Sequence, residues 1–277
     1  MTKSYLTDLR LGEIEMTLVP RDRQILETLR SLRYMRTNQV QRLFFFSNHS
    51  TPRASLTAAT KNLNRLKSAG LINHLEKRIG GVRTGSLGLV WHITEGGVRL
   101  LELSKGQERK RINAPDPSPM LLRHTLAVTE CYIQFTEICR MADGLNLKAI
   151  NVEPQCWRTY QKDGKTLSLR PDLYAEIENR GYVDSWFVEM DLDTETVQDI
   201  VEKCRRYQHY CQTNQEQQKN GVFPLVLWIV PTEERRKRIM EAIRFHFGSR
   251  YPQFHLVITP NALWNTLTEG AKKEDLC

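Results

Sequence analysis

Three features that mark other classes of protein are missing from this chain of 277 residues. No run of 18 or more apolar residues occurs, so we expect no membrane span, and residues 1–8 lack the apolar core of a secretory leader. The six cysteines are scattered without a Cys-x-x-Cys pair, which argues against a structural zinc site and indicates reduced thiols in a cytoplasmic protein. The loop Gly-x-x-x-x-Gly-Lys-Ser/Thr is also absent, so no NTPase is expected.

What is present is an asymmetry of charge. Residues 1–112 hold 20 Lys and Arg against 9 Asp and Glu, whereas residues 113–277 hold 20 against 23. The length suits two domains of ordinary size. A strongly basic half followed by a mildly acidic one points to a polyanionic partner for the N-terminal half.

Residues 15–104 show the pattern of three short helices followed by a β-hairpin. Apolar residues recur at helical spacing, Thr37 is the expected N-cap of the second helix, and Thr51 followed by proline opens the third. Two short apolar runs, 71–75 and 89–93, flank a basic tip rich in glycine. This order predicts a winged helix-turn-helix domain.

The third helix of that domain is the one expected in the major groove of duplex DNA. Its non-core positions mix cations with short hydrogen-bonding side chains, which are the types that hold phosphates and read base edges. The predicted DNA-binding residues are Arg53, Ser55, Thr57, Thr60, Lys61, Asn64 and Arg65 of the helix, and Lys77, Arg78 and Arg83 of the wing. The alternative is a solvated basic helix in a domain that contacts protein.

A charged, proline-rich stretch at residues 105–119 predicts a linker. Residues 120–268 then alternate predicted helices and strands, which gives a mixed sheet flanked by helices and an α+β fold class for the chain. The helix expected at 232–247 would present an exposed basic face at residues 235–238.

One hairpin of this second domain brings acidic residues together. A turn at Arg180-Gly181 places residues whose numbers sum to 361 opposite one another. Asp172 then faces Glu189, and Arg170 faces Asp191, all on one face of the sheet. Two facing carboxylates near a third acid are the ligands that a hard divalent cation prefers.

This order, with Pro171-Asp172 in one strand and Glu189-x-Asp191 in the next, resembles the PD-(D/E)xK nuclease fold. Over residues 15–250 the chain more closely resembles the replication-relaxation family of plasmids and integrative elements, whose members look like a winged helix joined to a nuclease-like domain. The matching positions are His124 with Ala127-Val128, Arg170-Pro171-Asp172, Glu189-Met190-Asp191, Thr194-Glu195, and Lys203 with Tyr207.

The resemblance implies metal roles for Asp172 and Glu189, with Asp191 as a third acid and Mg²⁺ or Mn²⁺ as the cation. The nuclease pattern has a Lys two residues after the Glu, where this chain has Asp191. Lys203 would replace that catalytic lysine, and Glu130 would supply a helix-borne catalytic acid. In the alternative, Asp191 forms an ion pair with Arg170, and the domain is a retired nuclease scaffold.

Three functions therefore stay open. The first is a DNA-binding accessory protein of a plasmid or other mobile element, acting in replication, relaxation or mobilisation with a degenerate nuclease-like domain and no required cofactor. The second is a Mg²⁺-dependent DNA endonuclease, and the third is a transcription regulator. The expected partners are double-stranded DNA, a second copy of the chain and replication or mobilisation proteins, with no membrane. A tyrosine relaxase is not expected, because Tyr207 is not accompanied by paired metal-binding histidines.

Overall fold

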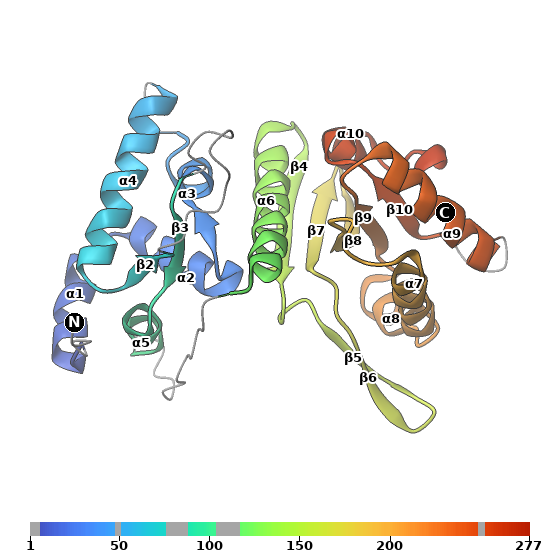
Figure 1. Ribbon diagram of the computed structural model, residues 1–277, viewed down its shortest axis with the longest axis horizontal. Helices are drawn as coiled ribbons and strands as arrows, with labels where there is room; N and C mark the ends of the chain where they lie inside the picture. Colours follow the sequence, from blue (N-terminus) through green and yellow to red (C-terminus); the bar gives the residue numbers. More distant parts are fainter. Residues whose placement is uncertain (1–5, 48–50, 76–87, 104–116, 249–252) are drawn as a thin grey trace. The chain divides into compact units, whose positions relative to one another are not determined.

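The computed structural model describes residues 6–47, 51–75, 88–103, 117–248 and 253–277. The chain divides into two compact units, Met1–Ile133 and Gln134–Cys277, each of which combines helices with strands (Figure 1). The division falls inside one long helix, α6 (Pro119–Met141). Most of the predicted linker at residues 105–119 lies outside the described residues, so that prediction stays untested.

The N-terminal unit packs helices around a small antiparallel sheet with the strand order β1-β3-β2. The helices and the hairpin expected from the sequence are present, while α1 and β1 are additional to that expectation. In chain order the elements are α1 (Asp8–Thr17), α2 (Pro20–Leu32), β1 (Met35–Arg36), α3 (Thr37–Phe44), α4 (Pro52–Ser68), β2 (Ile72–His74), β3 (Val90–Ile93) and α5 (Glu95–Leu103).

Local sequence sets the ends of α3 and α4. The Thr51 side chain accepts a hydrogen bond from the Ala54 amide at 3.1 Å and caps α4 as expected. Thr37, by contrast, is the first residue of α3 and not its cap, because the Gln39 side chain accepts from the Arg36 amide at 2.9 Å one residue earlier. The Thr37 hydroxyl instead accepts a hydrogen bond from the Trp91 indole at 3.0 Å, which ties α3 to β3.

The first part of α6 belongs to the N-terminal unit because it contributes to the core there. Leu122 and Leu126 form a buried cluster with Tyr34 and Val90. The Thr129 hydroxyl donates to the Tyr34 carbonyl at 3.0 Å. The sequence placed this helix in the second domain because its amphipathic pattern does not say which apolar partner the helix will find.

The C-terminal unit is a mixed five-stranded sheet with the strand order β10-β9-β8-β7-β4. Strands β4, β7 and β8 are antiparallel, and β8, β9 and β10 are parallel. Its elements are β4 (Leu145–Val152), β5 (Arg158–Lys162), β6 (Lys165–Leu169), β7 (Leu173–Asn179), β8 (Tyr182–Met190), α7 (Val197–Cys211), α8 (Gln215–Asn220), β9 (Leu225–Ile229), α9 (Glu233–Phe247), β10 (His255–Ile258) and α10 (Leu263–Glu269).

The register predicted for the β7–β8 hairpin is confirmed along both strands. Leu173 pairs with Val188 and Asn179 with Tyr182, so each pair sums to 361. The turn residues Arg180 and Gly181 have φ values of 50° and 92°, as a type I′ turn requires. Because side chains alternate along a strand, this register directs Glu189 and Phe187 to the same face of the sheet.

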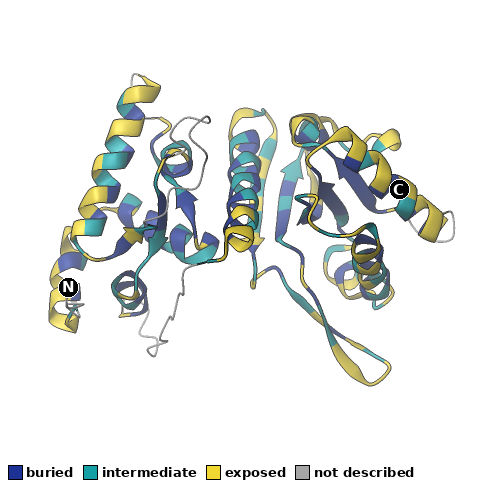
Figure 2. Cartoon of the chain, viewed as in Figure 1, coloured by how far each residue is buried: buried dark blue, intermediate teal, exposed yellow. Residues whose placement is uncertain are grey.

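Helices α7 and α9 contribute to the buried core on the Phe187 face of the sheet (Figure 2). Ile200, Val201 and Cys204 of α7 and Ile239 of α9 belong to one buried cluster with Phe187. Full burial of one such apolar side chain contributes about 1.5–3 kcal/mol. This packing places polar side chains of α7 within reach of Glu189.

Strands β5 and β6 form a separate two-stranded arm. It projects from the body of the C-terminal unit (Figure 1), and its tip is exposed, whereas Tyr160 and Leu169 near its base are buried. Asp163 and Gly164 at the tip both have positive φ, again as in a type I′ turn.

None of the helices in the described ranges is both long enough and apolar enough to cross a membrane.

Candidate functional site

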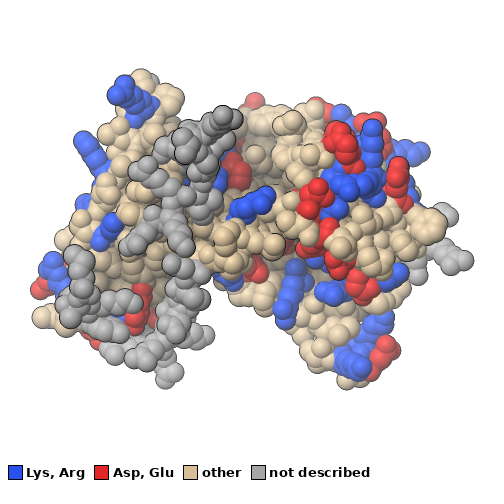
Figure 3. All heavy atoms as spheres, viewed as in Figure 1, with Lys and Arg blue, Asp and Glu red and all other residues tan. Residues whose placement is uncertain are grey.

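The outer face of α4 carries five of the seven DNA-binding residues predicted on this helix. Arg53, Thr57, Lys61 and Asn64 are exposed, and their spacing of three or four residues places them along one side of the helix. Thr60, half-buried, lies beside them. The helix holds four cations and no carboxylate, and in Figure 3 the charged side chains seen along α4 are Lys and Arg. Such a face suits a polyanion.

Two residues predicted to contact DNA have structural partners instead. Ser55 is buried, and its hydroxyl donates to the Phe45 carbonyl at 2.7 Å, so the prediction that it is a non-core position is wrong. Arg65 is partly exposed but lies 2.5 Å from Asp22, a fully buried carboxylate of α2 that also accepts from the Asn62 amide group at 2.8 Å. These contacts orient α4 on α2 and leave its outer face open.

The wing residues Lys77, Arg78 and Arg83 lie outside the described residues, so their predicted role stays a prediction. Glu130, the expected helix-borne acid, is engaged within the N-terminal unit. It accepts hydrogen bonds from the Arg42 guanidinium at 2.6 Å and from the Gln39 amide group at 2.9 Å. A carboxylate held by these two donors ties α6 to α3, which supports a structural role.

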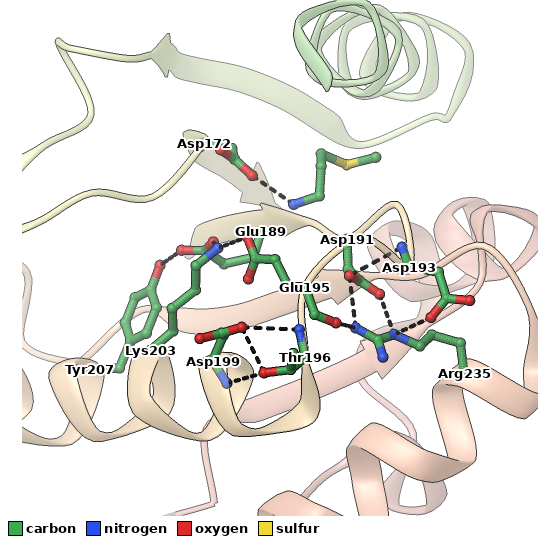
Figure 4. A network of polar contacts seen from close by, with 11 residues as sticks. Asp172, Glu189, Asp191, Asp193, Glu195, Thr196, Asp199, Lys203, Tyr207 and Arg235 are labelled. Carbon is green, nitrogen blue, oxygen red and sulfur yellow. Dashed lines mark hydrogen bonds and ion pairs between the residues drawn. The ribbon is translucent and has the colours of Figure 1, made fainter. Parts of the chain in front are cut away.

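Glu189 lies at the centre of a second group of polar residues, on the face of β8 toward α7 (Figure 4). Its side chain is 4% exposed. The Lys203 ammonium donates to one oxygen at 3.1 Å, and the Tyr207 hydroxyl donates to the other at 2.6 Å. Lys203 also donates to Glu195 at 2.8 Å. The structure therefore brings Glu189 and Lys203 together, as their predicted shared site requires.

Burial and charge shift the protonation equilibria of this group. Burial raises the pKa of Glu189 to about 7, although the Lys203 ammonium and the Tyr207 hydroxyl both oppose the rise. Burial also opposes the ammonium form of Lys203, but Glu189 and Glu195 outweigh it, so the pKa of Lys203 lies above its usual value. Burial raises the pKa of Tyr207 well above 10, and Tyr207 therefore acts as a hydrogen-bond donor and not as a phenolate nucleophile.

Asp172 lies one residue before β7 and close to Glu189, whose pKa its charge also raises. Its Oδ2 accepts from the Met190 amide at 2.8 Å, and its own amide donates to the Val188 carbonyl at 3.0 Å. The regular pairing of the hairpin ends at Leu173 and Val188, so Asp172 is fixed by its side chain and amide, beyond the last regular pair.

Asp191 is committed to an ion pair with Arg235 of α9. The side chains of Asp191 and Arg235 are 1% and 3% exposed, and the guanidinium donates from two nitrogens to both carboxylate oxygens, at 2.7 and 3.0 Å. The alternative in which Asp191 pairs with Arg170 is wrong, because Arg170 lies over the Trp157 ring at 4.6 Å. The expectation that Arg235 is part of an exposed basic face is also wrong.

These contacts bear on the predicted cation site. Its three carboxylates would supply the hard oxygen ligands that Mg²⁺ prefers. Asp191 is engaged by Arg235, however, and both oxygens of Glu189 accept hydrogen bonds. Across the described part of the chain, no group of three or more His, Cys, Asp or Glu side chains is arranged to hold a metal ion. The residues present therefore do not fit a three-carboxylate metal centre.

Sequence reasoning named Thr194-Glu195 in the segment that links β8 to α7, but it missed the contacts that Arg235 makes there. The Arg235 guanidinium also donates to the Glu195 carbonyl at 2.7 Å and lies 3.2 Å from Asp193. Thr196 then caps α7, since its hydroxyl accepts from the Asp199 amide at 3.2 Å. The capping box Thr-x-x-Asp was the available signal for the start of this helix. Arg235 carried no comparable signal, because the three basic residues that follow it look the same.

A model of the family described as Replication-relaxation matches residues 26–226. No curated protein and no solved structure matches the chain. The matched stretch covers well over half of the 277 residues and includes both α4 and the group around Glu189. The chain therefore belongs to the replication-relaxation family.

Proposed function

We propose that the chain is a DNA-binding protein of a plasmid or other mobile element, in which the N-terminal unit is a winged helix-turn-helix domain that places α4 in the major groove of duplex DNA. The observation that carries the proposal is the face of α4, where exposed cations and short hydrogen-bonding side chains are interrupted by no carboxylate. The order of α2, α3, α4 and the β2–β3 hairpin supports the same assignment.

In this proposal α4 contacts phosphates, which position the protein on the duplex, and base edges, which provide sequence specificity. Arg53 and Asn64 are of the types that hydrogen-bond base edges, whereas Lys61 is suited to a phosphate. The buried Asp22 holds Asn62 and Arg65 on the inner side of the helix. DNA would thus meet a helix whose rotation about its own axis is already fixed, with Arg53 and Lys61 directed outward.

The test is fluorescence anisotropy with a labelled 30-base-pair duplex and the full chain. The double variant Arg53→Ala/Lys61→Ala is expected to weaken binding by tenfold or more, since each such contact is worth about 1–3 kcal/mol. The matched control is Lys237→Ala/Lys272→Ala, which removes two exposed cations of the C-terminal unit. No duplex binding by the wild type, or equal losses in both variants, would overturn the proposal.

Metal-dependent cleavage of DNA is a second candidate, favoured by the contact between Lys203 and Glu189 beside Asp172. We favour the non-catalytic alternative, in which the PD-(D/E)xK-like domain serves partner binding or dimerisation, because Asp191 is held by Arg235. Nicking of supercoiled plasmid with Mg²⁺ or Mn²⁺ decides between them. Nicking by the wild type that is lost in both Asp172→Asn and Lys203→Met would establish the catalytic alternative.

A further inference from the structure

The arm formed by β5 and β6 carries a local excess of positive charge within a unit that is otherwise not basic. Residues 158–170 hold four cations and one acid, whereas residues 134–277 as a whole hold 19 cations and 21 acids. Arg158 is paired with Glu216 at 2.6 Å, which leaves Lys162, Lys165 and Arg170 as the cations in excess. The DNA-binding role proposed for α4 makes no use of this arm. Its charge therefore calls for a separate explanation.

The cations at the tip of the arm face one another. Lys162 pairs directly with Lys165 across the type I′ turn. Like charges at directly opposite positions destabilise a hairpin, because their side chains are about 5 Å apart. Neither lysine forms a salt bridge with another described residue. This arrangement becomes favourable when an anion lies between or above the two ammonium groups.

Helix α7 contributes a further cation, Arg206, next to those of the arm. Burial lowers the pKa of His209 on α7, and the charge of the nearby Lys162 lowers it further. Burial raises the pKa of Tyr160 on the arm, and the charge of Arg206 opposes this rise. Arg206 is exposed and likewise forms no salt bridge with a described residue. The neighbouring Arg205, by contrast, is paired with Glu202 at 3.0 Å. We name Lys162, Lys165 and Arg206, together with Arg170 at the base of the arm, the basic arm surface.

The basic arm surface adjoins the group around Glu189 both at the end of β6 and along α7. Arg170 follows β6 directly and precedes Asp172 by two residues. On α7, Arg206 lies one turn beyond Lys203, and residues three apart on a helix are neighbours. A strand of nucleic acid that follows the cations would be led to Asp172 and Lys203.

We infer that the basic arm surface binds the sugar–phosphate backbone of DNA and forms a second DNA contact in addition to α4. The chemistry is that of a backbone site, since lysines act as point charges on phosphates. The other face of the arm carries the uncharged hydrogen-bonding groups of Thr159, Gln161, Thr166 and Ser168, and at the base of the arm Arg170 donates to the Ser168 hydroxyl at 3.5 Å. This contact is independent of base sequence. The inference rests on the proposed DNA binding by α4 and extends the DNA contact to the C-terminal unit.

The experiment measures duplex affinity of the full chain as a function of salt concentration. The variant Lys162→Gln/Lys165→Gln/Arg206→Gln removes three cations and keeps Arg170, whose stacking on Trp157 holds the base of the arm. The control Lys237→Gln/Lys272→Gln/Lys273→Gln lowers the net charge by the same amount at exposed positions elsewhere in the unit. Circular dichroism checks that both variants are folded.

Each phosphate contact contributes about 0.9 to the slope of log Kobs against log salt concentration, so the arm variant is expected to lose about 2 to 3 from the slope. Its affinity should fall about tenfold or more at low salt, while the control keeps the wild-type slope. A wild-type slope in the arm variant, or an equal loss in the control, would overturn this inference. If the double variant Arg53→Ala/Lys61→Ala still weakens binding by tenfold or more in that case, the proposed function stands and only the arm contact fails.

Discussion

Helix α4 and the segment between β8 and α9 are both rich in charge, but they use it in opposite ways. On α4, Arg53 and Lys61 are exposed and form no ion pair with any described residue. At the end of β8, Asp191 is buried against Arg235 of α9, and Glu189 is buried against Lys203 of α7. An exposed unpaired charge contributes little to folding and is available to a ligand. A buried charge is costly to leave without its partner.

The largest loss of stability is expected on removal of Arg235. In Arg235→Ala, the Asp191 carboxylate stays buried without its bidentate partner, so the free energy of unfolding should fall by about 3–5 kcal/mol. Urea denaturation followed by circular dichroism measures the change. Arg238→Ala is the matched control on the same helix, because Arg238 is exposed and only approaches Asp193 at 3.3 Å. Similar losses in the two variants would show that burial of the ion pair does not matter.

Substitution of Lys203 should lower the free energy of unfolding by a smaller amount, and this loss should depend on pH. The pKa of Glu189 is raised in the folded protein, so Glu189 binds its proton more tightly there than in the unfolded chain. Its contribution to stability therefore falls as pH rises from about 4.5 to about 7. Lys203→Met removes the ammonium that opposes this rise, so the fall should extend to higher pH. We expect the variant to lose more stability at pH 8 than at pH 5.

Urea denaturation at both pH values checks this expectation, and Glu189→Gln serves as its control. In Glu189→Gln the titrating carboxyl is gone, so further substitution of Lys203 should no longer change the pH dependence through this site. A loss in Lys203→Met that is the same at pH 5 and pH 8 would contradict the assigned coupling between Lys203 and Glu189.

The same comparison explains what the sequence could and could not predict. The β7–β8 register followed from a local turn and strict alternation, and the helix face of Arg53, Thr57 and Lys61 followed from helical spacing. The partner of Asp191 did not, because Arg235 is 44 residues away and is brought close only by packing of α9 against the sheet. Ser55 was misassigned for a related reason: a small hydroxyl looks the same in sequence whether it faces water or a buried carbonyl.

The smallest effect on stability is expected on α4 itself, where two arginines of one helix differ in role. Arg65→Ala leaves the buried Asp22 with the Asn62 amide group and the Val19 amide as its remaining donors, so unfolding should become easier by about 1–2 kcal/mol. Arg53→Ala removes an exposed cation without a described ion-pair partner and should change stability by less than about 0.5 kcal/mol.

The same two substitutions should rank in the opposite order when duplex affinity is measured in place of stability. Arg53→Ala is expected to weaken binding by about tenfold, because it removes a contact from an intact helix. Arg65→Ala should weaken it less at temperatures where the variant is fully folded, since Arg65 is directed toward Asp22. Thermal unfolding and fluorescence anisotropy on both variants give the two measurements. If Arg65 proved the more important residue for binding, its contact with Asp22 would have to open when DNA binds, and the division between structural and DNA-binding charges on α4 would fail.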